Sequence, residues 1–165
     1  MRIGHAWDTH RLVPDRELIL GGVKVESTVG LLGHSDADVC YHAVAESLLG
    51  ALALGDLGTF FPDNDEKYKG ISSEIIMKEC YAKVKEKGYR ISNLDLTIYS
   101  EKIKISPIRN EIRSNIARLL ETDIDNVSVK ATTWEKMGFV GRGEAIACEC
   151  VSLVDKRGER VLLWE

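Results

Sequence analysis

The sequence has no long apolar run, which limits where the protein can reside. Among its 165 residues, no stretch is long and apolar enough to cross a bilayer as a helix. Residues 1–24 also lack the basic segment followed by an apolar segment that marks a secretory signal peptide. We therefore expect a cytoplasmic protein without a membrane partner.

Cysteine motifs for metal or disulfide chemistry are missing as well. None of the four cysteines has C-x-x-C spacing, and three of them lie in apolar stretches with a helical or strand pattern. Thiols in such stretches are typical of a protein core in a reducing compartment. We predict reduced core side chains, rather than zinc ligands or disulfides, at Cys40, Cys80, Cys148 and Cys150.

Basic residues are not in excess. The chain has 22 Lys and Arg residues against 26 Asp and Glu residues, which gives a formal net charge of -4. A general nucleic-acid binder would carry a basic face, so we expect no nucleic-acid partner. The charge balance still permits a phosphorylated small molecule to bind through local cations.

No internal repeat, low-complexity segment or linker divides the chain. With 44% hydrophobic and 29% charged residues, we expect a single domain over residues 1–165 with a sizeable core. Runs rich in Val, Ile and Leu predict strands at residues 1–10, 18–25, 94–100, 127–133, 145–154 and 160–164. Apolar periodicity predicts helices at about 36–54 and 73–87, and a third that begins at Ser106 and Pro107. Together these elements indicate an α/β (α+β) fold.

Two histidines and an aspartate suggest a metal site. The N-terminal residues alternate like a strand, so Asp8 and His10 point the same way. His42 lies on the first predicted helix, in a polar stripe with Asp38 and Glu46. Two histidines and one carboxylate suit tetrahedral zinc with the fourth position open, which is typical of a catalytic site. The alternative is two surface histidines and a capping aspartate.

The polar stripe of this predicted helix has two interpretations. Either Asp38 or Glu46 is placed to accept the second ring N–H of His42, as carboxylates often do for a metal-binding histidine. An ordinary solvated helix face explains the same stripe more simply. On a different face of the same predicted helix, apolar residues at helical spacing predict a stripe that packs in the core. This stripe consists of Cys40, Val44, Leu48 and Leu52.

The start of this helix offers a possible anion site. Free backbone N–H groups and the positive end of the helix dipole attract phosphate, and His34 and Ser35 lie just ahead of the helix. His34 is therefore placed to stabilise charge on a phosphoryl group, although Asp36 and Asp38 oppose a second anion. Capping of the helix by Ser35 explains the same residues without a ligand.

Residues 130–136, with the sequence KATTWEK, form another polar cluster. Its hydroxyls and lysines offer donors for phosphate oxygens, and Glu135 offers an oxygen ligand for Mg²⁺ or Mn²⁺. A strand end that meets solvent would have the same composition. Two other loops fail the motifs they suggest. Residues 60–70 lack the glycine of a calcium-binding EF-hand, and residues 138–143 lack the glycine order of a dinucleotide loop.

Several segments together resemble one enzyme family. In chain order they read MRIGHAWDTH, GLLGHSDADVCYHA, LGDLGTFFPDND and VKATTWEKMGFVGRGEAIAC. They are similar to the 2-C-methyl-D-erythritol 2,4-cyclodiphosphate synthases of the non-mevalonate isoprenoid pathway, from residue 1 to about residue 154. The resemblance implies a mixed sheet with helices on one side, in the subunit of a homotrimer whose active sites lie between subunits.

The resemblance also implies roles for individual residues. The zinc ligands are Asp8, His10 and His42, and the ligand for Mg²⁺ or Mn²⁺ is Glu135; Asp8, His10 and Glu135 also belong to the substrate site. Transition-state stabilisation falls to the catalytic residues His34 and Thr133, which bind substrate as well. The ribose and methylerythritol parts of the substrate contact Ser35, Asp56, Gly58, Asp63 and Asp65. The cytidine diphosphate end contacts the loop of residues 100–106, with Ser100, Lys104 and Ile105, and Thr132. Further substrate or central-cavity positions are Phe139 and Arg142.

The implied reaction is an intramolecular phosphoryl transfer. The 2-phosphate of 4-diphosphocytidyl-2-C-methyl-D-erythritol 2-phosphate attacks the β-phosphorus and CMP leaves, which closes 2-C-methyl-D-erythritol 2,4-cyclodiphosphate. Zinc would orient phosphate oxygens, and the ion on Glu135 would stabilise the leaving group. Two other classes are compatible with these residues: a zinc phosphoesterase that activates water, and a nucleotide-binding module without turnover.

Some segments depart from the family pattern. Residues 101–103 are more charged than expected of the nucleotide loop, and Trp134 is bulkier than the usual residue, which affects the expected cytidine contacts. Residues 155–165 form a short C-terminal extension past the usual end of the family. Its apolar run at 161–164 predicts an added short strand without an evident function.

Overall fold

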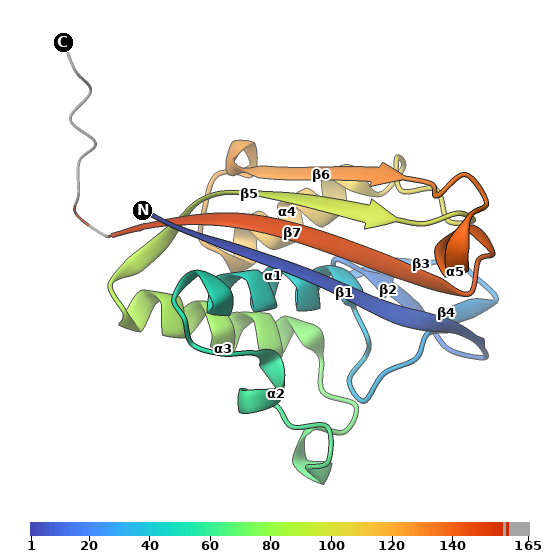
Figure 1. The fold of residues 1–165 in the computed structure, drawn as a ribbon, viewed down its shortest axis with the longest axis horizontal. Coiled ribbons are helices and arrows are strands. Elements are labelled where there is room, and N and C mark those ends of the chain that lie inside the picture. The colour runs from blue at the N-terminus through green and yellow to red at the C-terminus, as the bar shows by residue number, and fades with distance from the viewer. Residues whose placement is uncertain (157, 159–165) are drawn as a thin grey trace.

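A five-stranded mixed sheet organises the protein (Figure 1). The computed structural model describes residues 1–156 and residue 158. The strand order is β4 (Val29–Leu31), β1 (Arg2–Pro14), β7 (Ala145–Lys156), β5 (Tyr89–Tyr99) and β6 (Val127–Thr132). Strands β5 and β6 are parallel, and the other neighbours are antiparallel. The predicted mixed sheet is therefore confirmed.

The long helices cover one face of this sheet. They are α1 (Val39–Ala51), α3 (Ser73–Glu86) and α4 (Arg109–Leu119). Along β5, Leu94, Leu96 and Ile98 are buried in one cluster with side chains of all these helices, and the residues between them are only half-buried. This alternation with a period of two places one face of the strand in the core.

The apolar stripe predicted along α1 faces the core. Cys40, Val44 and Leu48 are fully buried, and Leu52 packs against the same cluster just beyond the end of the helix. The predicted core position of the cysteines is also confirmed, because all four side chains are buried. In the described part of the chain, no helix combines the length and the apolar character needed to span a membrane.

Two glycines divide the strand predicted at residues 18–25. β2 (Leu18–Leu20) and β3 (Val23–Val25) form a separate antiparallel hairpin. Gly21 and Gly22 connect them with φ angles of 57° and 74°. Glycine adopts this left-handed backbone without a steric penalty, so a tight turn forms where the apolar pattern alone predicts a continuous strand.

The sequence analysis does not predict several short elements of the structure. Besides β4, they are α2 (Leu57–Phe60), η1 (Glu66–Tyr68), η2 (Ile124–Asn126) and α5 (Gly138–Gly141). Elements of this length are too short to reveal a hydrophobic period. The last strand, β7, continues to Lys156, so residues 155–156 of the predicted extension belong to the sheet. The strand predicted at 160–164, with the run at 161–164, lies outside the described residues.

Two helices begin later than the sequence predicts. α1 begins after Asp38 rather than after Ser35, because Ala37 has a φ of 60°, which is outside the helical region. α4 begins at Arg109 without a side-chain cap, so Ser106 is not its N-cap. Residues 106–108 form a turn instead.

The sheet face opposite the helices carries exposed apolar side chains. Ile3 is 71% exposed, and Trp7 and Val151 are each 43% exposed. Near them, Nε2 of His5 lies 2.8 Å from a carboxylate oxygen of Glu149. A sheet face with several large apolar side chains in solvent typically marks an interaction surface.

Candidate active site

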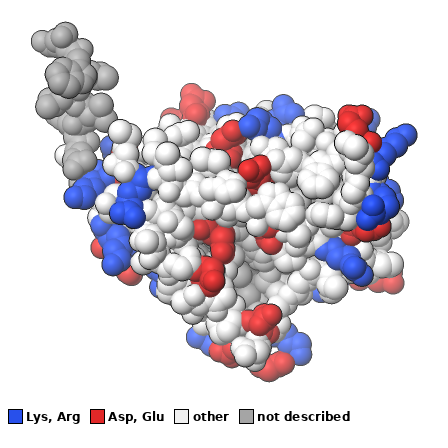
Figure 2. All heavy atoms as spheres, viewed as in Figure 1, with Lys and Arg blue, Asp and Glu red and all other residues white. Residues whose placement is uncertain are grey.

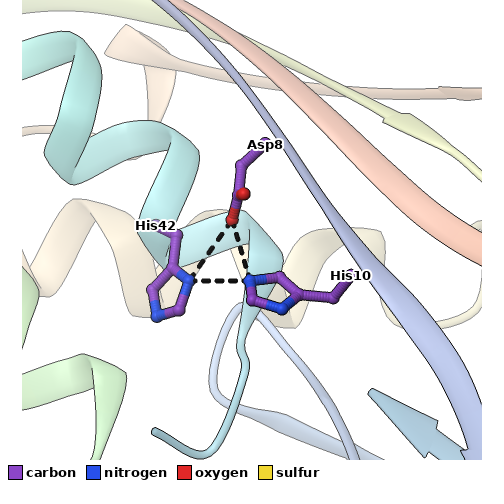
Figure 3. A group of neighbouring side chains, drawn as sticks. All are labelled: Asp8, His10 and His42. Carbon is purple, nitrogen blue, oxygen red and sulfur yellow. Dashed lines mark hydrogen bonds and ion pairs between the residues drawn. The ribbon is translucent and has the colours of Figure 1, made fainter. Parts of the chain in front are cut away.

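Asp8, His10 and His42 form one cluster between β1 and α1 (Figure 3). Asp8 and His10 are two residues apart on β1, and His42 projects toward them from α1. Oδ2 of Asp8 lies 3.0 Å from Nε2 of His10 and 3.3 Å from Nδ1 of His42. The two ring nitrogens are 3.0 Å apart. The structure thus brings together the residues that the sequence singled out.

Small residues on β1 allow α1 to approach closely enough for this cluster to form. A Cβ atom on Gly4 would lie 1.7 Å from the carbonyl oxygen of Ser47 in α1, so only glycine fits there. Ala6 follows on the same face of β1 and is buried. Because these positions carry little side-chain volume, α1 packs near the strand and His42 reaches Asp8.

Both imidazole rings have partners for the nitrogen that points away from the cluster. Nδ1 of His10 lies 2.8 Å from the carbonyl oxygen of Leu32. That oxygen only accepts, so Nδ1 carries the proton and Nε2 of His10 carries a lone pair. Nε2 of His42 contacts the hydroxyls of Ser73 and Ser35 at 2.9 and 3.1 Å.

The cluster has the donor chemistry of a cation site. The buried Oδ2 of Asp8 has no hydrogen-bond donor among the described residues. It faces Nε2 of His10 and Nδ1 of His42, and these ligand atoms all lie within 4.8 Å of one another. When the outward nitrogens carry the ring protons, the inward atoms are all acceptors, and a cation among them satisfies each one.

Electrostatics keep Asp8 ionised. Burial raises the pKa of Asp8, but the contacts with His10 and His42 outweigh burial and hold this pKa well below its usual range. Burial lowers the pKa of His10, but the contact with Asp8 outweighs burial, so the pKa of His10 is raised. Asp8 is therefore an anion at neutral pH, and a proton on His10 competes with a metal ion for the same space.

Neither carboxylate of the polar stripe on α1 accepts the second ring N–H of His42. The carboxylate of Asp38 is fully buried and accepts two N–H groups of the β2–β3 turn at 2.9 and 2.7 Å, besides capping α1. Burial raises the pKa of Asp38 to about 6. Glu46 accepts the N–H of Leu57 at 2.9 Å. Each carboxylate is thus engaged elsewhere, and the prediction that one of them is the partner of His42 is wrong.

The backbone donors at the start of α1 are also engaged. Cys40 and Tyr41 donate their N–H groups to Asp38, and Ala37 donates its N–H to Oγ of Ser35 at 3.0 Å. These donors are not free for a phosphate, so the expected anion site at this helix end is not supported. His34 and Ser35 still line the cavity described next.

A cavity of about 630 Å³ opens beside the metal cluster. Figure 2 shows this side of the molecule hollowed beneath the sheet, with acidic side chains at the border. Of the residues proposed from the sequence, the lining includes Asp8, His10, His34, Ser35, His42, Gly58 and Asp63. Sequence reasoning missed most of the apolar wall, which includes Trp7, Leu57, Phe61, Tyr68, Ile71 and Ile76. The available signal was the pair of phenylalanines at 60–61, which lie outside any periodic element.

The segment between α1 and α3 forms one wall of this cavity. Asp56 caps α2, and Asp65 caps η1. Nε2 of His34 lies 3.3 Å from the carbonyl oxygen of Asp65, and the carbonyl oxygen of His34 accepts the N–H of Gly70 at 2.8 Å. The structure thus places His34 against this wall, whereas Asp56 and Asp65 hold its short helices and are not in the lining.

The residues expected at the nucleotide end gather where β5 and β6 end. The N–H of Ser100 donates to the carbonyl oxygen of Thr132 at 3.1 Å, which joins the two segments. Ser100 and Ile105 are buried. The remaining members are exposed and outside the cavity lining; they are Lys104, Thr132, Thr133 and Glu135.

Glu135 lies on a strained turn. Its φ is 50°, and that of Lys136 is 62°, which is unusual for residues with a side chain. Oγ1 of Thr133 donates to the Glu135 carboxylate at 3.1 Å, and the N–H of Trp134 donates to the Glu101 carboxylate at 3.1 Å. The Glu101 carboxylate therefore anchors the turn that carries Glu135.

Comparisons with known proteins decide the family. Residues 1–155 match the model of the YgbB family. A 2-C-methyl-D-erythritol 2,4-cyclodiphosphate synthase from Carboxydothermus hydrogenoformans is 54% identical over 154 residues, which are 93% of this chain and 94% of that protein. The chain belongs to the 2-C-methyl-D-erythritol 2,4-cyclodiphosphate synthase family. A synthase from Brachyspira hyodysenteriae is 52% identical over 156 residues, which are 94% of this chain and 99% of that protein.

Solved structures of the synthase family have the same fold. The complex of Plasmodium falciparum IspF with CDP matches with a TM-score of 0.84 and 37% sequence identity, over 95% of this chain and 97% of that chain. The resemblance noted in the sequence is confirmed, and the chain is an enzyme of this family.

A row of aromatic rings connects the cavity wall to the ends of β5 and β6. The Trp134 ring packs against Tyr99 and Phe139, with centroids 5.9 and 5.5 Å apart. Phe139 also meets the cavity-lining Trp7 edge to face, at 6.4 Å. Arg142 is exposed and forms an ion pair within its own loop. The substrate roles expected for Phe139 and Arg142 stay predictions.

Proposed function

We propose that this enzyme converts 4-diphosphocytidyl-2-C-methyl-D-erythritol 2-phosphate to 2-C-methyl-D-erythritol 2,4-cyclodiphosphate and CMP, in non-mevalonate isoprenoid biosynthesis. The observation that carries the proposal is the convergence of Asp8, His10 and His42 on the wall of a cavity, in a chain of this family. An oxygen of the 2-phosphate forms a bond to the β-phosphorus. The bond from that phosphorus to the bridging oxygen breaks, and its electron pair leaves with CMP, so no water is consumed.

Asp8, His10 and His42 would hold zinc. Two imidazole nitrogens and one carboxylate oxygen are donors that zinc prefers, and three protein ligands leave a position for a substrate oxygen. Zinc bound there supplies positive charge and a fixed orientation for phosphate oxygens. Asp8 contributes the negative ligand, and the carbonyl oxygen of Leu32 holds the His10 ring at the required angle.

Glu135 would bind Mg²⁺ or Mn²⁺ together with the substrate phosphates. It is exposed, and one carboxylate combined with phosphates is a common setting for these ions. An ion bound there supplies charge that favours departure of CMP. The turn anchored by Glu101 presents the Glu135 carboxylate toward solvent, where a substrate can reach it.

The other residues would act by positioning and charge, which is most of what phosphoryl transfer requires. His34 lines the cavity, and Thr133 lies beside Glu135; both can donate a hydrogen bond to the phosphoryl group in the transition state. The methylerythritol and ribose parts would contact Ser35, Asp56, Gly58, Asp63 and Asp65. The cytidine diphosphate part would contact Ser100, Lys104, Ile105 and Thr132, with Phe139 and Arg142 at the border.

We further propose a homotrimer in which each active site joins the cavity of one subunit to the Glu135 region of its neighbour. Two observations support this arrangement. The Glu135 region is exposed and outside the cavity lining, so the cavity of its own chain does not include it. The outer sheet face exposes Ile3, Trp7 and Val151, as a subunit interface would.

Phosphorus NMR tests the proposed reaction. The purified protein is incubated with the cytidine-linked substrate, Zn²⁺ and Mg²⁺, and the expected products are the cyclic diphosphate and CMP. A linear phosphate product would identify a zinc phosphoesterase instead. Binding of CMP without turnover of the substrate would identify a nucleotide-binding module.

A further inference from the structure

The ring nitrogen of His42 that points away from the metal cluster meets a buried hydroxyl pair. Nε2 of His42 lies 2.9 Å from Oγ of Ser73 and 3.1 Å from Oγ of Ser35. Ser73 is 0% exposed and Ser35 is 6% exposed. Ser73 is the first residue of α3, so the contact joins α3 to the ring carried by α1.

One arrangement of protons satisfies all of these groups while Nδ1 of His42 keeps its lone pair for a metal. The ring proton is on Nε2 and is donated to the Ser73 hydroxyl. Ser73 donates its own proton to the carboxylate of Asp36, whose other oxygen accepts the N–H of Ser73 at 3.0 Å. Ser35 is the weaker acceptor for His42, because its oxygen already accepts the N–H of Ala37.

We propose that Ser73 and Asp36 are positioning residues for His42, an inference that rests on the proposed zinc site. Ser73 fixes the tautomer and the angle of the ring. Asp36 takes the hydroxyl proton of Ser73, which leaves the Ser73 oxygen free to accept from Nε2. A carboxylate thus acts on His42 through one hydroxyl and makes Nδ1 a better ligand. The matching partner of His10 is the backbone carbonyl of Leu32, which no side-chain substitution removes.

Replacing Asp36 by asparagine changes the proton arrangement while it keeps the side-chain volume; the oxygen that accepts the Ser73 hydroxyl also accepts the N–H of Asp38 at 3.2 Å. An amide N–H at position 36 can donate to Ser73, and the Ser73 hydroxyl can then donate to Nε2 of His42. The ring proton moves to Nδ1, the nitrogen that faces the metal. A wrong tautomer of this kind is known to disable a histidine while its geometry stays intact. Asp36→Asn changes the shape of the side chain little and should still weaken zinc binding.

The test compares zinc affinity between variants of the full chain. Zinc is titrated in competition with a chromophoric chelator, and the visible spectrum of the Co²⁺-loaded protein reports the ligand field. We expect Ser73→Ala and Asp36→Asn to bind zinc about 10- to 100-fold more weakly than the parent. Both variants should also show shifted Co²⁺ bands. Ser73→Thr, which keeps the hydroxyl, should restore most of the affinity.

The matched control is Ser72→Ala. Ser72 is the N-cap of α3, is exposed, and accepts the N–H of Glu74 at 3.3 Å. Its loss removes a hydroxyl from the same helix end, so thermal stability should fall slightly while zinc affinity stays unchanged. Equal weakening by Ser72→Ala would reduce Ser73 to a structural role and overturn the inference.

The remaining outcomes distinguish this inference from the proposed function. A parent protein that binds zinc, with Ser73→Ala and Asp36→Asn of the same affinity and Co²⁺ spectrum, overturns the inference alone. A parent that binds no zinc overturns the metal assignment as well. If Ser73→Ala does not fold, Asp36→Asn and Ser73→Thr decide between the same outcomes.

Discussion

The two halves of the proposed active site are built in different ways. In the metal half, both rings are held by partners within the chain, and the buried Asp38 fixes the start of the helix that carries His42. In the nucleotide half, Thr133 and Glu135 are exposed and contact mainly each other. One chain therefore determines the metal half almost completely. In the proposed trimer, the substrate and a neighbouring subunit would complete the nucleotide half.

The largest effect is expected where the metal half itself is broken. His42→Ala removes one of the proposed protein ligands, so zinc affinity should fall by more than about 1000-fold. The zinc content of the dialysed protein, measured by atomic emission, checks this. The control is His34→Ala, which removes a histidine of the same cavity and should keep its zinc. Stoichiometric zinc in His42→Ala would refute the assignment.

A smaller effect, on turnover alone, is expected in the nucleotide half. Glu135→Gln removes a negative ligand and leaves the metal cluster intact, so zinc content should match that of the parent. Loss of a charge contact to the phosphoryl group costs about 3 kcal/mol, or about 100-fold in turnover. Glu111→Gln, an exposed change on α4, serves as the control. Parent-like turnover and Mg²⁺ dependence in Glu135→Gln would remove Glu135 from the site.

The pH dependence of zinc binding probes the charge coupling inside the metal half. The pKa of His10 is raised, so His10 gains its proton at a higher pH than an ordinary histidine as the solution is acidified. Asp8 has a lowered pKa and stays ionised over this range. The proton on His10 then competes with zinc, and affinity should fall by at least about tenfold per pH unit below the pKa of His10.

NMR titration of the zinc-free protein separates the causes of that shift. In Asp8→Asn the strongest raising contact is gone, while burial and the weaker raising effects of the Leu32 carbonyl and Asp38 remain, so the pKa of His10 should fall from its raised value. An unchanged pKa for His10 in Asp8→Asn would mean that the carboxylate does not control this ring.

Local spacing predicts the long elements and the pairing of Asp8 with His10, whereas the convergence of His42 on that pair is implied by the family resemblance. A strand period places Asp8 with His10, and a helix period sets the buried stripe of α1; both depend on local spacing. The partner of His42 could not be predicted in this way. Ser73 lies on another helix, and only the packing of α3 against α1 brings it to the ring. Asp38 and Glu46 were the nearest candidates in sequence, but each is engaged by a backbone N–H elsewhere.

Other features depend on information that spacing does not carry. The positive φ of Ala37 determines where α1 begins, and that of Gly21 determines where β2 ends. Such backbone angles depend on single residues rather than on hydrophobic periodicity. Most of the apolar wall of the cavity comes from residues 57–71, a segment without a hydrophobic period. The cytoplasmic location and the single domain over residues 1–165 stay predictions. The trimer also stays a prediction, because a subunit interface depends on a second copy of the chain.

The smallest expected effect tests whether the two halves of one site come from different subunits. Asp8→Asn breaks only the metal half, and Lys104→Glu breaks only the nucleotide half, so each protein alone should be nearly inactive. When equimolar amounts are refolded together, a site recovers wherever the intact metal half of one chain meets the intact nucleotide half of the next. In a closed ring of three subunits with random assembly, roughly a quarter of the sites meet this condition.

Turnover of the mixture should therefore rise to roughly a quarter of the parent value. Mixing Asp8→Asn with His42→Ala is the control, because both changes break the metal half and no pairing restores it. Sites built within single subunits would give no recovery in either mixture. Native mass spectrometry of differently tagged chains establishes that mixed trimers form. Mixed trimers without recovery would place both halves in one chain, so the exposed Glu135 region would then have to reach the cavity of its own subunit.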